Sequence, residues 1–118
     1  MFHGFRLDSV SWLTEVDVLA FTSDREGAPM AALEALAIGI PVVARARGGL
    51  PEMLADLAGC RLVESGDPAV LAKDVFVVLK AGERPQMPKR NEIRRCAALY
   101  RQLYGRVAAA GLSASTLE

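Results

Sequence analysis

The chain has 118 residues, a length that suits a single domain with one modest hydrophobic core. Its 14 Lys and Arg side chains balance its 14 Asp and Glu side chains, so it has no general positive field that would favour a nucleic-acid partner. No apolar run reaches the ~18 residues that a membrane-spanning helix requires, and the first residues lack the basic-then-apolar order of a secretory signal. We therefore expect a cytoplasmic protein, associated at most with the inner face of a membrane.

Neither the cysteines nor the acidic residues show the spacing of a metal site. Cys60 and Cys96 are the only two cysteines and lie far apart in the sequence, so we expect reduced thiols with packing roles. No Asp-x-Asp pair lies on a loop that could hold a metal ion. We expect no metal and no cofactor.

Short apolar runs alternate along the chain with segments of helical spacing. A strand tail is expected at Met1–Gly4, and buried strands at Val18–Phe21, Pro41–Ala44 and Arg61–Val63. Helices are expected at Val10–Val16, Pro29–Ile38 and Pro51–Leu57, and from Asp67-Pro68 to Gly82. This alternation with uniformly apolar strands predicts a parallel sheet covered on both faces, which is the α/β class.

The expected elements divide the chain into an α/β part at residues 1–83, a linker at 84–91, a C-terminal helix at 92–111 and a tail at 112–118. We expect Leu117-Glu118, at the end of this tail, to derive from an expression vector. The closing helix is amphipathic, with one apolar side. Its other side carries Arg94, Arg95, Arg101 and Arg106. Two interpretations of this side stay open: a solvated or docking face, and contact with a partner or a membrane surface.

One carboxylate stands alone in an apolar stretch. Between Ala28 and Ala44, Glu34 is the only charged residue. Apolar side chains surround it on the same face of the expected helix, so turning Glu34 to solvent would also expose them. These neighbours are Met30, Leu33, Ala37 and Ile38. Because burying an unpaired carboxylate is costly, we expect a polar group to meet it, either a ligand or an arginine elsewhere in the chain.

Two loops are expected at the carboxyl edge of the sheet, where parallel α/β sheets bind ligands. The segment 22–27 supplies hydroxyls, carboxylates and a glycine just before the helix at Pro29. Backbone N–H groups at a helix start lack internal partners, so an anion would be well placed near Gly27–Met30. The segment 45–52 repeats this design with the paired glycines Gly48 and Gly49. Both loops should open on the same edge.

The order of these motifs resembles one family, the retaining, nucleotide-sugar-dependent glycosyltransferases of the GT-B fold (family 4, or group 1, type). The resemblance runs from Phe2 to about Leu79 and matches the second half of that family's C-terminal, donor-binding domain. The matching motifs are His3-Gly4-Phe5 followed by Asp17-Val18, Ser23-x2-Glu26-Gly27-x-Pro29-Met30-x3-Glu34-Ala35, Gly39-x-Pro41-Val42-Val43-Ala44, and Gly48-Gly49-x-Pro51-Glu52. Glu26 and Glu34 form the E-x7-E motif at the centre of this set.

The resemblance implies a Rossmann-like sheet, a partial GT-B C-terminal domain with a long C-terminal helix, and a nucleotide-diphosphate sugar as substrate. It implies that Glu34 holds the ribose hydroxyls of the nucleotide. It also implies a catalytic role for Glu26 beside the donor sugar, where a carboxylate positions the sugar or stabilises positive charge at the reacting carbon. The implied donor-binding residues are Ser23, Gly27, Ala28, Pro29, Met30, Glu34, Gly48 and Gly49.

Purely structural interpretations of the same residues, without a role in catalysis or binding, stay open. Glu26 is also consistent with an exposed loop acid, and Gly48-Gly49 with a plain turn before a helix whose dipole Glu52 complements. His3 fits a strand-end residue better than a catalyst.

The chain also departs from the family pattern. It is too short for the acceptor-binding domain, the first strands of the donor domain and the upstream Arg/Lys pair that neutralises the diphosphate, and Arg25, Arg45 and Arg47 are no obvious replacements. The strand at Val18–Phe21 is therefore expected to leave an open edge, through which the chain could form a homo-oligomer. The favoured function is the donor-binding portion of a glycosyltransferase with an unknown acceptor. The alternative is a catalytically inactive nucleotide-sugar binding or interaction module that works only with a partner chain.

Overall fold

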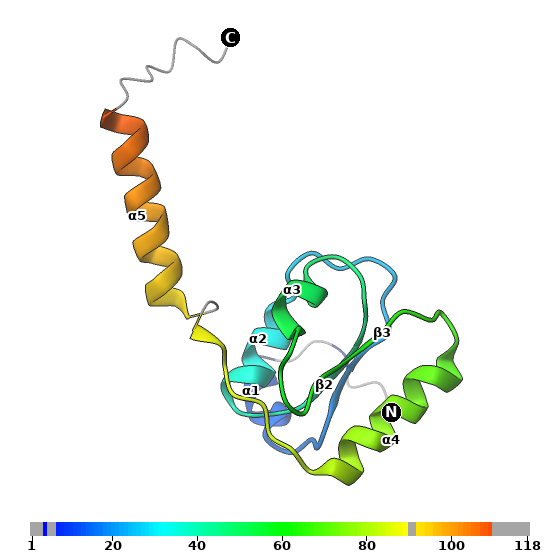
Figure 1. The fold of residues 1–118 in the computed structure, drawn as a ribbon. Coiled ribbons are helices and arrows are strands. Elements are labelled where there is room, and N and C mark those ends of the chain that lie inside the picture. Colours follow the sequence, from blue (N-terminus) through cyan, green and yellow to red (C-terminus); the bar gives the residue numbers. More distant parts are fainter. Residues whose placement is uncertain (1–3, 5–6, 90–91, 110–118) are drawn as a thin grey trace. The chain divides into compact units, whose positions relative to one another are not determined.

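The computed structural model describes residues 4, 7–89 and 92–109 (Figure 1). The chain forms two compact units, Met1–Met87 and Pro88–Glu118. The strand expected at Met1–Gly4 lies outside the described residues except for Gly4, as do His3 and the tail at 112–118. None of the described helices is long and apolar enough to cross a membrane.

A three-stranded parallel sheet forms the centre of the first unit. Its strands are β1 (Leu19–Phe21), β2 (Val42–Arg45) and β3 (Arg61–Val63), in the spatial order β1-β2-β3. Leu19 pairs with Val42, and Val43 pairs with Arg61. The three strands and their order along the chain confirm the predicted α/β class.

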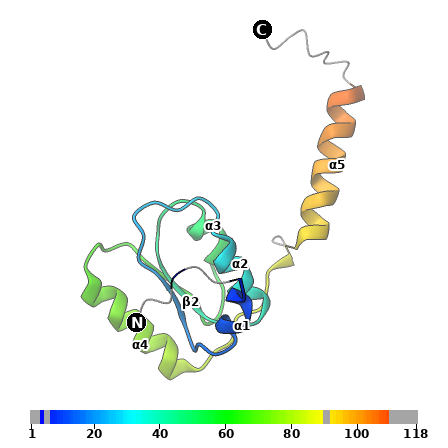
Figure 2. The ribbon, with the colours of Figure 1, turned by 180° about the vertical axis from the view of Figure 1, so that it is seen from behind.

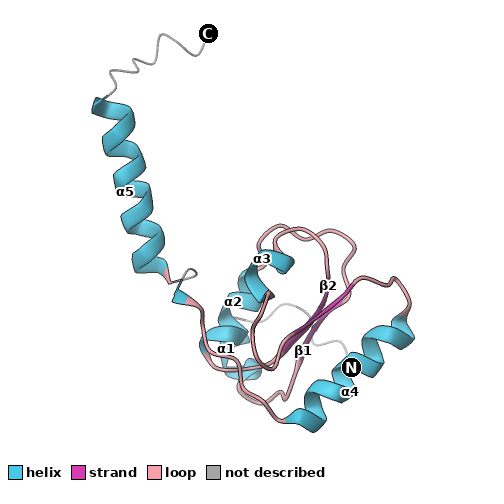
Figure 3. Cartoon of the chain, in the orientation of Figure 1, coloured by secondary structure: helices cyan, strands magenta, loops and turns pink. Residues whose placement is uncertain are grey.

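Helices cover both faces of the sheet, as Figure 3 shows. On one face, α2 (Met30–Ala37) and α3 (Leu50–Leu54) pack against Val42 and Ala44 of the central strand. On the other face, α4 (Pro68–Ala81) packs against Val43 and Val63. Successive side chains of a strand point to opposite faces, so the uniformly apolar β2 serves both layers.

The two layers are unequally filled. The α2/α3 layer contains nine buried side chains, whereas the α4 layer contains three. The predicted stripe of α4 is only partly confirmed, because Val78 is buried and Leu71 and Val75 pack against it, while Val70 and Leu79 are exposed. Figure 2 shows α4 from behind. The core of the unit therefore lies mainly between the sheet and α2/α3.

Local signals fix the ends of α4 as the sequence predicts. The Asp67 carboxylate accepts a hydrogen bond from the Ala69 N–H at 2.9 Å, and Pro68 occupies the first turn. Gly82 ends the helix in the left-handed conformation, with φ of 65°. An ion pair of 3.0 Å between Arg61 and Asp74 joins the helix to β3.

Other boundaries differ from the prediction. Helix α1 spans Ser9–Leu13 and stops before Val16. Helix α3 ends at Leu54, three residues early, because Asp56 adopts φ of 61°, a left-handed conformation that Asp tolerates better than most residues. These shortened ends leave the order of elements unchanged.

Strand β1 lies at the edge of the described sheet. It pairs with β2 on one side, and no second strand pairs with it within the described residues. Ala20 faces the same side as its pairing partner Val43, yet it is exposed because α4 contacts β2 and β3. The expected open edge is present there, and self-association through it stays a prediction.

Helix α5 (Ile93–Ala109) belongs to the second unit. It contains no buried residue. The last two residues of the helix expected at 92–111 lie outside the described part of the chain.

Cys60 offers a test of the α2/α3 layer. It packs against the buried cluster, and burial raises the pKa of its thiol above the ordinary value, although a hydrogen bond with the backbone of Val42 partly offsets this effect. A raised pKa leaves less thiolate at a given pH, and the thiolate is the form that reacts with iodoacetamide. In a Cys96→Ser variant, Cys60 should therefore react several-fold more slowly in the folded chain than in denaturant, at about pH 8. Equal rates would contradict this packing.

Candidate functional site

The loops after β1 and β2 meet in direct backbone contact. The N–H of Gly49 donates a hydrogen bond to the carbonyl oxygen of Gly27 at 2.7 Å. The two strands are parallel neighbours, so their carboxyl ends lie at one edge. The prediction that both loops open on the same edge is confirmed.

The paired glycines make this contact sterically possible. A Cβ atom on Gly48 would lie 1.5 Å from the carbonyl oxygen of Glu26, and Gly48 also has φ of 59°. A Cβ on Gly49 would lie 2.6 Å from the oxygen of Gly27. No side chain fits at either position without moving the loop, so these glycines do more than form a turn.

Helix α2 begins directly behind this contact. Pro29 is its N-cap residue, and no side chain accepts a hydrogen bond there, in contrast to Asp67 at α4. Ala32 donates its N–H to the Pro29 carbonyl oxygen at 3.1 Å. The first N–H groups of α2 therefore lack a side-chain acceptor, and they lie at the positive end of the helix dipole.

The two glutamates of the E-x7-E motif are both half-buried. Glu26 follows β1, and Glu34 lies in the second turn of α2. Neither carboxylate forms a hydrogen bond or an ion pair with any residue that the structure describes. The arginine partner that the sequence left open for Glu34 is therefore not found among these residues.

The prediction that the apolar face around Glu34 is buried is wrong for three of its four residues, whereas Leu33 is half-buried and packs against the core. Met30 is 65% exposed and Ile38 is 39% exposed, and Ala37 is exposed as well. The buried side of α2 is instead formed by Ala32, Ala35 and Leu36. Glu34 therefore lies beside an exposed apolar strip and not inside the core.

The remaining predicted site residues lie on the surface of the same edge. Ser23, Gly27, Ala28 and Gly48 are exposed, and Pro29 and Gly49 are half-buried. Glu52 lies in the first turn of α3 and is exposed. Arg47 approaches Glu64 at 3.8 Å, an exposed ion pair.

Sequence reasoning missed the role of Arg45. Its side chain is only 17% exposed and forms an ion pair with Asp24 of the first loop. Its Nε atom is buried and has no hydrogen-bond partner in the described structure. Arg45 lines a hollow of about 80 Å³ with Thr22 and Ser65. The missed signal was the period of two: Arg45 is the last residue of β2, one position beyond the expected strand, and its side chain shares the face of Val43, the α4 side.

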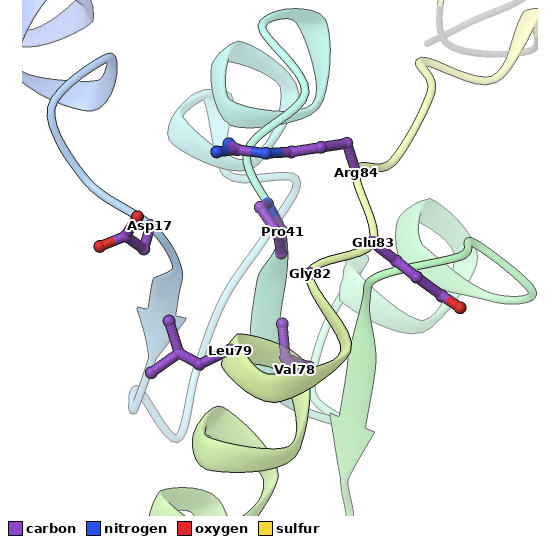
Figure 4. A pocket seen from close by; sticks show the side chains of 7 residues that line it. All are labelled: Asp17, Pro41, Val78, Leu79, Gly82, Glu83 and Arg84. Atoms are coloured by element: carbon purple, nitrogen blue, oxygen red, sulfur yellow. The ribbon is translucent and has the colours of Figure 1, made fainter.

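A second hollow lies at the opposite edge of the sheet. Its volume is about 110 Å³, and Figure 4 shows Val78 pointing toward Pro41, Leu79 extending toward the side of Asp17, and the Arg84 side chain lying above Pro41. Asp17 and Pro41 precede β1 and β2, so this hollow lies at the amino ends of the strands and far from the two loops. Among the described residues, no group of three His, Cys, Asp or Glu side chains could hold a metal ion.

Comparison with known proteins gives consistent matches. The family model described as "Glycosyl transferases group 1" matches residues 1–95. The chain is similar to the amylovoran biosynthesis glycosyltransferase AmsK of Erwinia amylovora, with 34% identity over 65% of this chain and 20% of AmsK. It is also similar to the D-inositol 3-phosphate glycosyltransferase of Streptomyces coelicolor, with 35% identity over 87% of this chain and 21% of that protein. The chain thus spans about a fifth of the length of these relatives.

Replacing Gly48 tests the contact between the loops. We expect Gly48→Ala to lower the free energy of unfolding by about 2 kcal/mol, because the new Cβ collides with the Glu26 carbonyl and φ is positive. Gly27→Ala is the control, since its Cβ would meet nothing within 4 Å, and it should change stability by less than about 0.5 kcal/mol. Urea denaturation measures both, and equal effects would refute the contact.

Replacing Asp24 tests the Arg45 ion pair. Asp24→Asn should lower the free energy of unfolding by about 1 kcal/mol, because it removes the charge that pairs with a mostly buried guanidinium, while the exposure of Asp24 itself limits the loss. Glu64→Gln, which breaks the exposed pair with Arg47, should cost less than about 0.5 kcal/mol. Thermal melts of both variants check the ranking, and a reversed order would contradict it.

Proposed function

Since the chain belongs to the glycosyl transferases group 1 family, we propose that its first unit binds a nucleotide-diphosphate sugar, the donor for sugar transfer to an acceptor. The observation that carries this proposal is the backbone contact between the Glu26–Gly27 loop and Gly48–Gly49, directly in front of α2. This contact brings a carboxylate residue, glycines and an uncapped helix start to one edge of the sheet.

The start of α2 supports a role in binding the diphosphate. Its first N–H groups have no side-chain acceptor, and a phosphate can accept hydrogen bonds from them. Gly27, Ala28 and Met30 are exposed, so a ligand can approach the backbone there. In this proposal these residues, with Ser23 and Pro29, surround the diphosphate and the adjoining sugar.

The two glutamates take different roles. Glu34 accepts hydrogen bonds from the ribose hydroxyls, which gives its half-buried carboxylate the partners that the described residues do not supply. Glu26 lies beside the donor sugar, where its negative charge stabilises the positive charge that develops as the bond between the anomeric carbon and the diphosphate breaks. The diphosphate leaves with the bonding electrons, and the acceptor hydroxyl attacks the same carbon and passes its proton to an oxygen of the departing diphosphate. Retention of configuration is part of the proposal and rests on the family resemblance.

The acceptor side of the reaction requires more protein than this chain. The chain spans about a fifth of its relatives, and β1 has a free edge within the described sheet. We therefore propose that the chain binds donor by itself and transfers sugar only together with an acceptor-binding domain or partner chain. Donor binding that persists without any transfer after such a partner is added would favour the inactive binding module.

Glu34→Gln tests the donor site. Titration calorimetry with UDP, GDP and ADP sugars should show binding of one donor class by the original chain. The variant should bind about ten- to a hundredfold more weakly, because a charged hydrogen bond to a ribose hydroxyl contributes about 1.5–3 kcal/mol. The free energy of unfolding should stay the same or rise, because the substitution removes a half-buried charge without a partner among the described residues.

Glu52→Gln is the matched control, since Glu52 is exposed in the first turn of α3 and has no assigned contact with the donor. It should leave donor affinity unchanged. Equal weakening in both variants would point to a general effect of charge, and absence of heat with every donor would refute the proposal.

A further inference from the structure

Arg45 connects two loops at the carboxyl edge of the sheet. It is the last residue of the central strand β2. Its Nη1 atom pairs with the carboxylate of Asp24, in the loop after β1. Its Nη2 atom lies close to the loop after β3, where a Cβ atom on Gly66 would be 3.0 Å from it. The guanidinium group is thus in contact with the loops on both sides of its own strand.

Arg45 is the fixed partner of this ion pair. Its backbone pairs with Val63 of β3, and the next residue, Ala46, donates its N–H to the Val63 carbonyl oxygen at 2.9 Å. The Arg45 side chain is only 17% exposed, whereas the side chain of Asp24 is 78% exposed and belongs to a loop. The ion pair therefore restrains the loop after β1 relative to the sheet.

Glu26 lies between the two points at which this loop is attached. Asp24, two residues before it, is held by the ion pair, and Gly27, directly after it, accepts the hydrogen bond from Gly49. Within the described structure, Asp24 is the only side chain of this loop with an ion pair or a hydrogen bond. Because two residues span at most about 7 Å, a shift of Asp24 also moves the backbone of Glu26.

The ion pair adds little stability compared with an apolar side chain at the same place. The Nε atom of Arg45 is buried without a hydrogen-bond partner among the described residues, and such an atom is costly. A carboxylate as exposed as that of Asp24 offsets only part of this cost, because water screens its charge. Apolar replacements of enclosed ion pairs are often as stable as the pair itself. The main physical effect of the pair is therefore to fix the position of the loop.

We propose that Arg45, acting through Asp24, positions Glu26 against the donor sugar. A functional side chain has to be held within about 0.5 Å of its working geometry by its neighbours, and the Glu26 carboxylate has no partner of its own among the described residues. The inference rests on the proposed function, in which Glu26 lies beside the sugar and Glu34, on α2, holds the ribose. Arg45 and Asp24 are then positioning residues that affect the sugar part of the donor and not its nucleotide part.

The ratio of two dissociation constants tests this role. UDP, GDP and ADP share the ribose and the diphosphate with UDP-glucose, GDP-mannose and ADP-glucose, and each pair differs only in the sugar. Titration calorimetry of the full chain with the pair that it binds most tightly gives its preference for the nucleotide sugar. Asp24→Asn should lower this preference about three- to tenfold, because Glu26 is displaced but still present. Asp24→Glu keeps the charge at an exposed position and should retain most of the preference.

A double variant separates positioning from a general effect of charge. In a Glu26→Gln background, Asp24→Asn should change the preference no further, because the carboxylate that it positions is already absent. Additive effects would overturn the proposal, and so would a preference that either single substitution leaves unchanged. Glu64→Gln is the matched control, since it removes a carboxylate from an exposed ion pair at the same edge of the sheet. It should leave the preference unchanged.

Arg45→Met separates positioning from folding. This substitution removes the guanidinium group and keeps a long apolar side chain, so the urea midpoint should stay the same or rise. The preference for the nucleotide sugar should nevertheless fall as it does in Asp24→Asn. A lower midpoint with an unchanged preference would assign the ion pair a purely structural role.

The same titrations distinguish a failure of this inference from a failure of the proposed function. If the original chain binds neither the nucleotides nor the nucleotide sugars, both fail. If it binds them and the variants at Asp24 and Arg45 keep the original preference, only the positioning role of the ion pair is refuted.

Discussion

The candidate site depends on one contact, in which the peptide backbone after β2 presses against the backbone after β1. The carbonyl oxygen of Glu26 occupies the space of a missing Cβ on Gly48, and the N–H of Gly49 bonds to the oxygen of Gly27. Each loop leads into a helix, so this contact also fixes the starts of α2 and α3 relative to each other. Parallel pairing brings the two strand ends together, and the glycines let the loops close the remaining distance.

The sequence predicts the elements well where single residues mark their limits. Asp67-Pro68 and Gly82 determine both ends of α4, and the apolar runs determine the strands. It fails for the orientation of α2, because MAALEALA is apolar on nearly every side and its spacing does not reveal which side packs on the sheet. Packing against the sheet determines which side of α2 is buried. The alanines Ala32 and Ala35 take the side against β2, where small side chains allow close approach, and larger Met30 stays outside.

This orientation of α2 changes the interpretation of Glu34. In the sequence, Glu34 is conspicuous because a buried unpaired carboxylate would be costly. In the structure it is half-buried beside exposed apolar residues, so water can reach part of it and the energetic penalty is smaller. The loop contact and the uncapped start of α2 therefore support a donor site more strongly than the cost of burying Glu34 does. Arg45 differs in the opposite direction. The sequence suggests an exposed loop cation, whereas in the structure its side chain is one of the least exposed charged groups.

The two faces of the sheet differ in a way that bears on what the chain can do alone. The face with α2 and α3 contains most of the buried core, and both helices start at the loop contact. The opposite face is thinly covered, and Ala20 on β1 is exposed although it lies within a strand. The candidate site lies where α2 and α3 begin, on the well-packed face of the sheet. Its backbone geometry therefore does not depend on further cover over the opposite face. Donor binding can therefore be a property of this chain even where the reaction needs further protein to supply the acceptor.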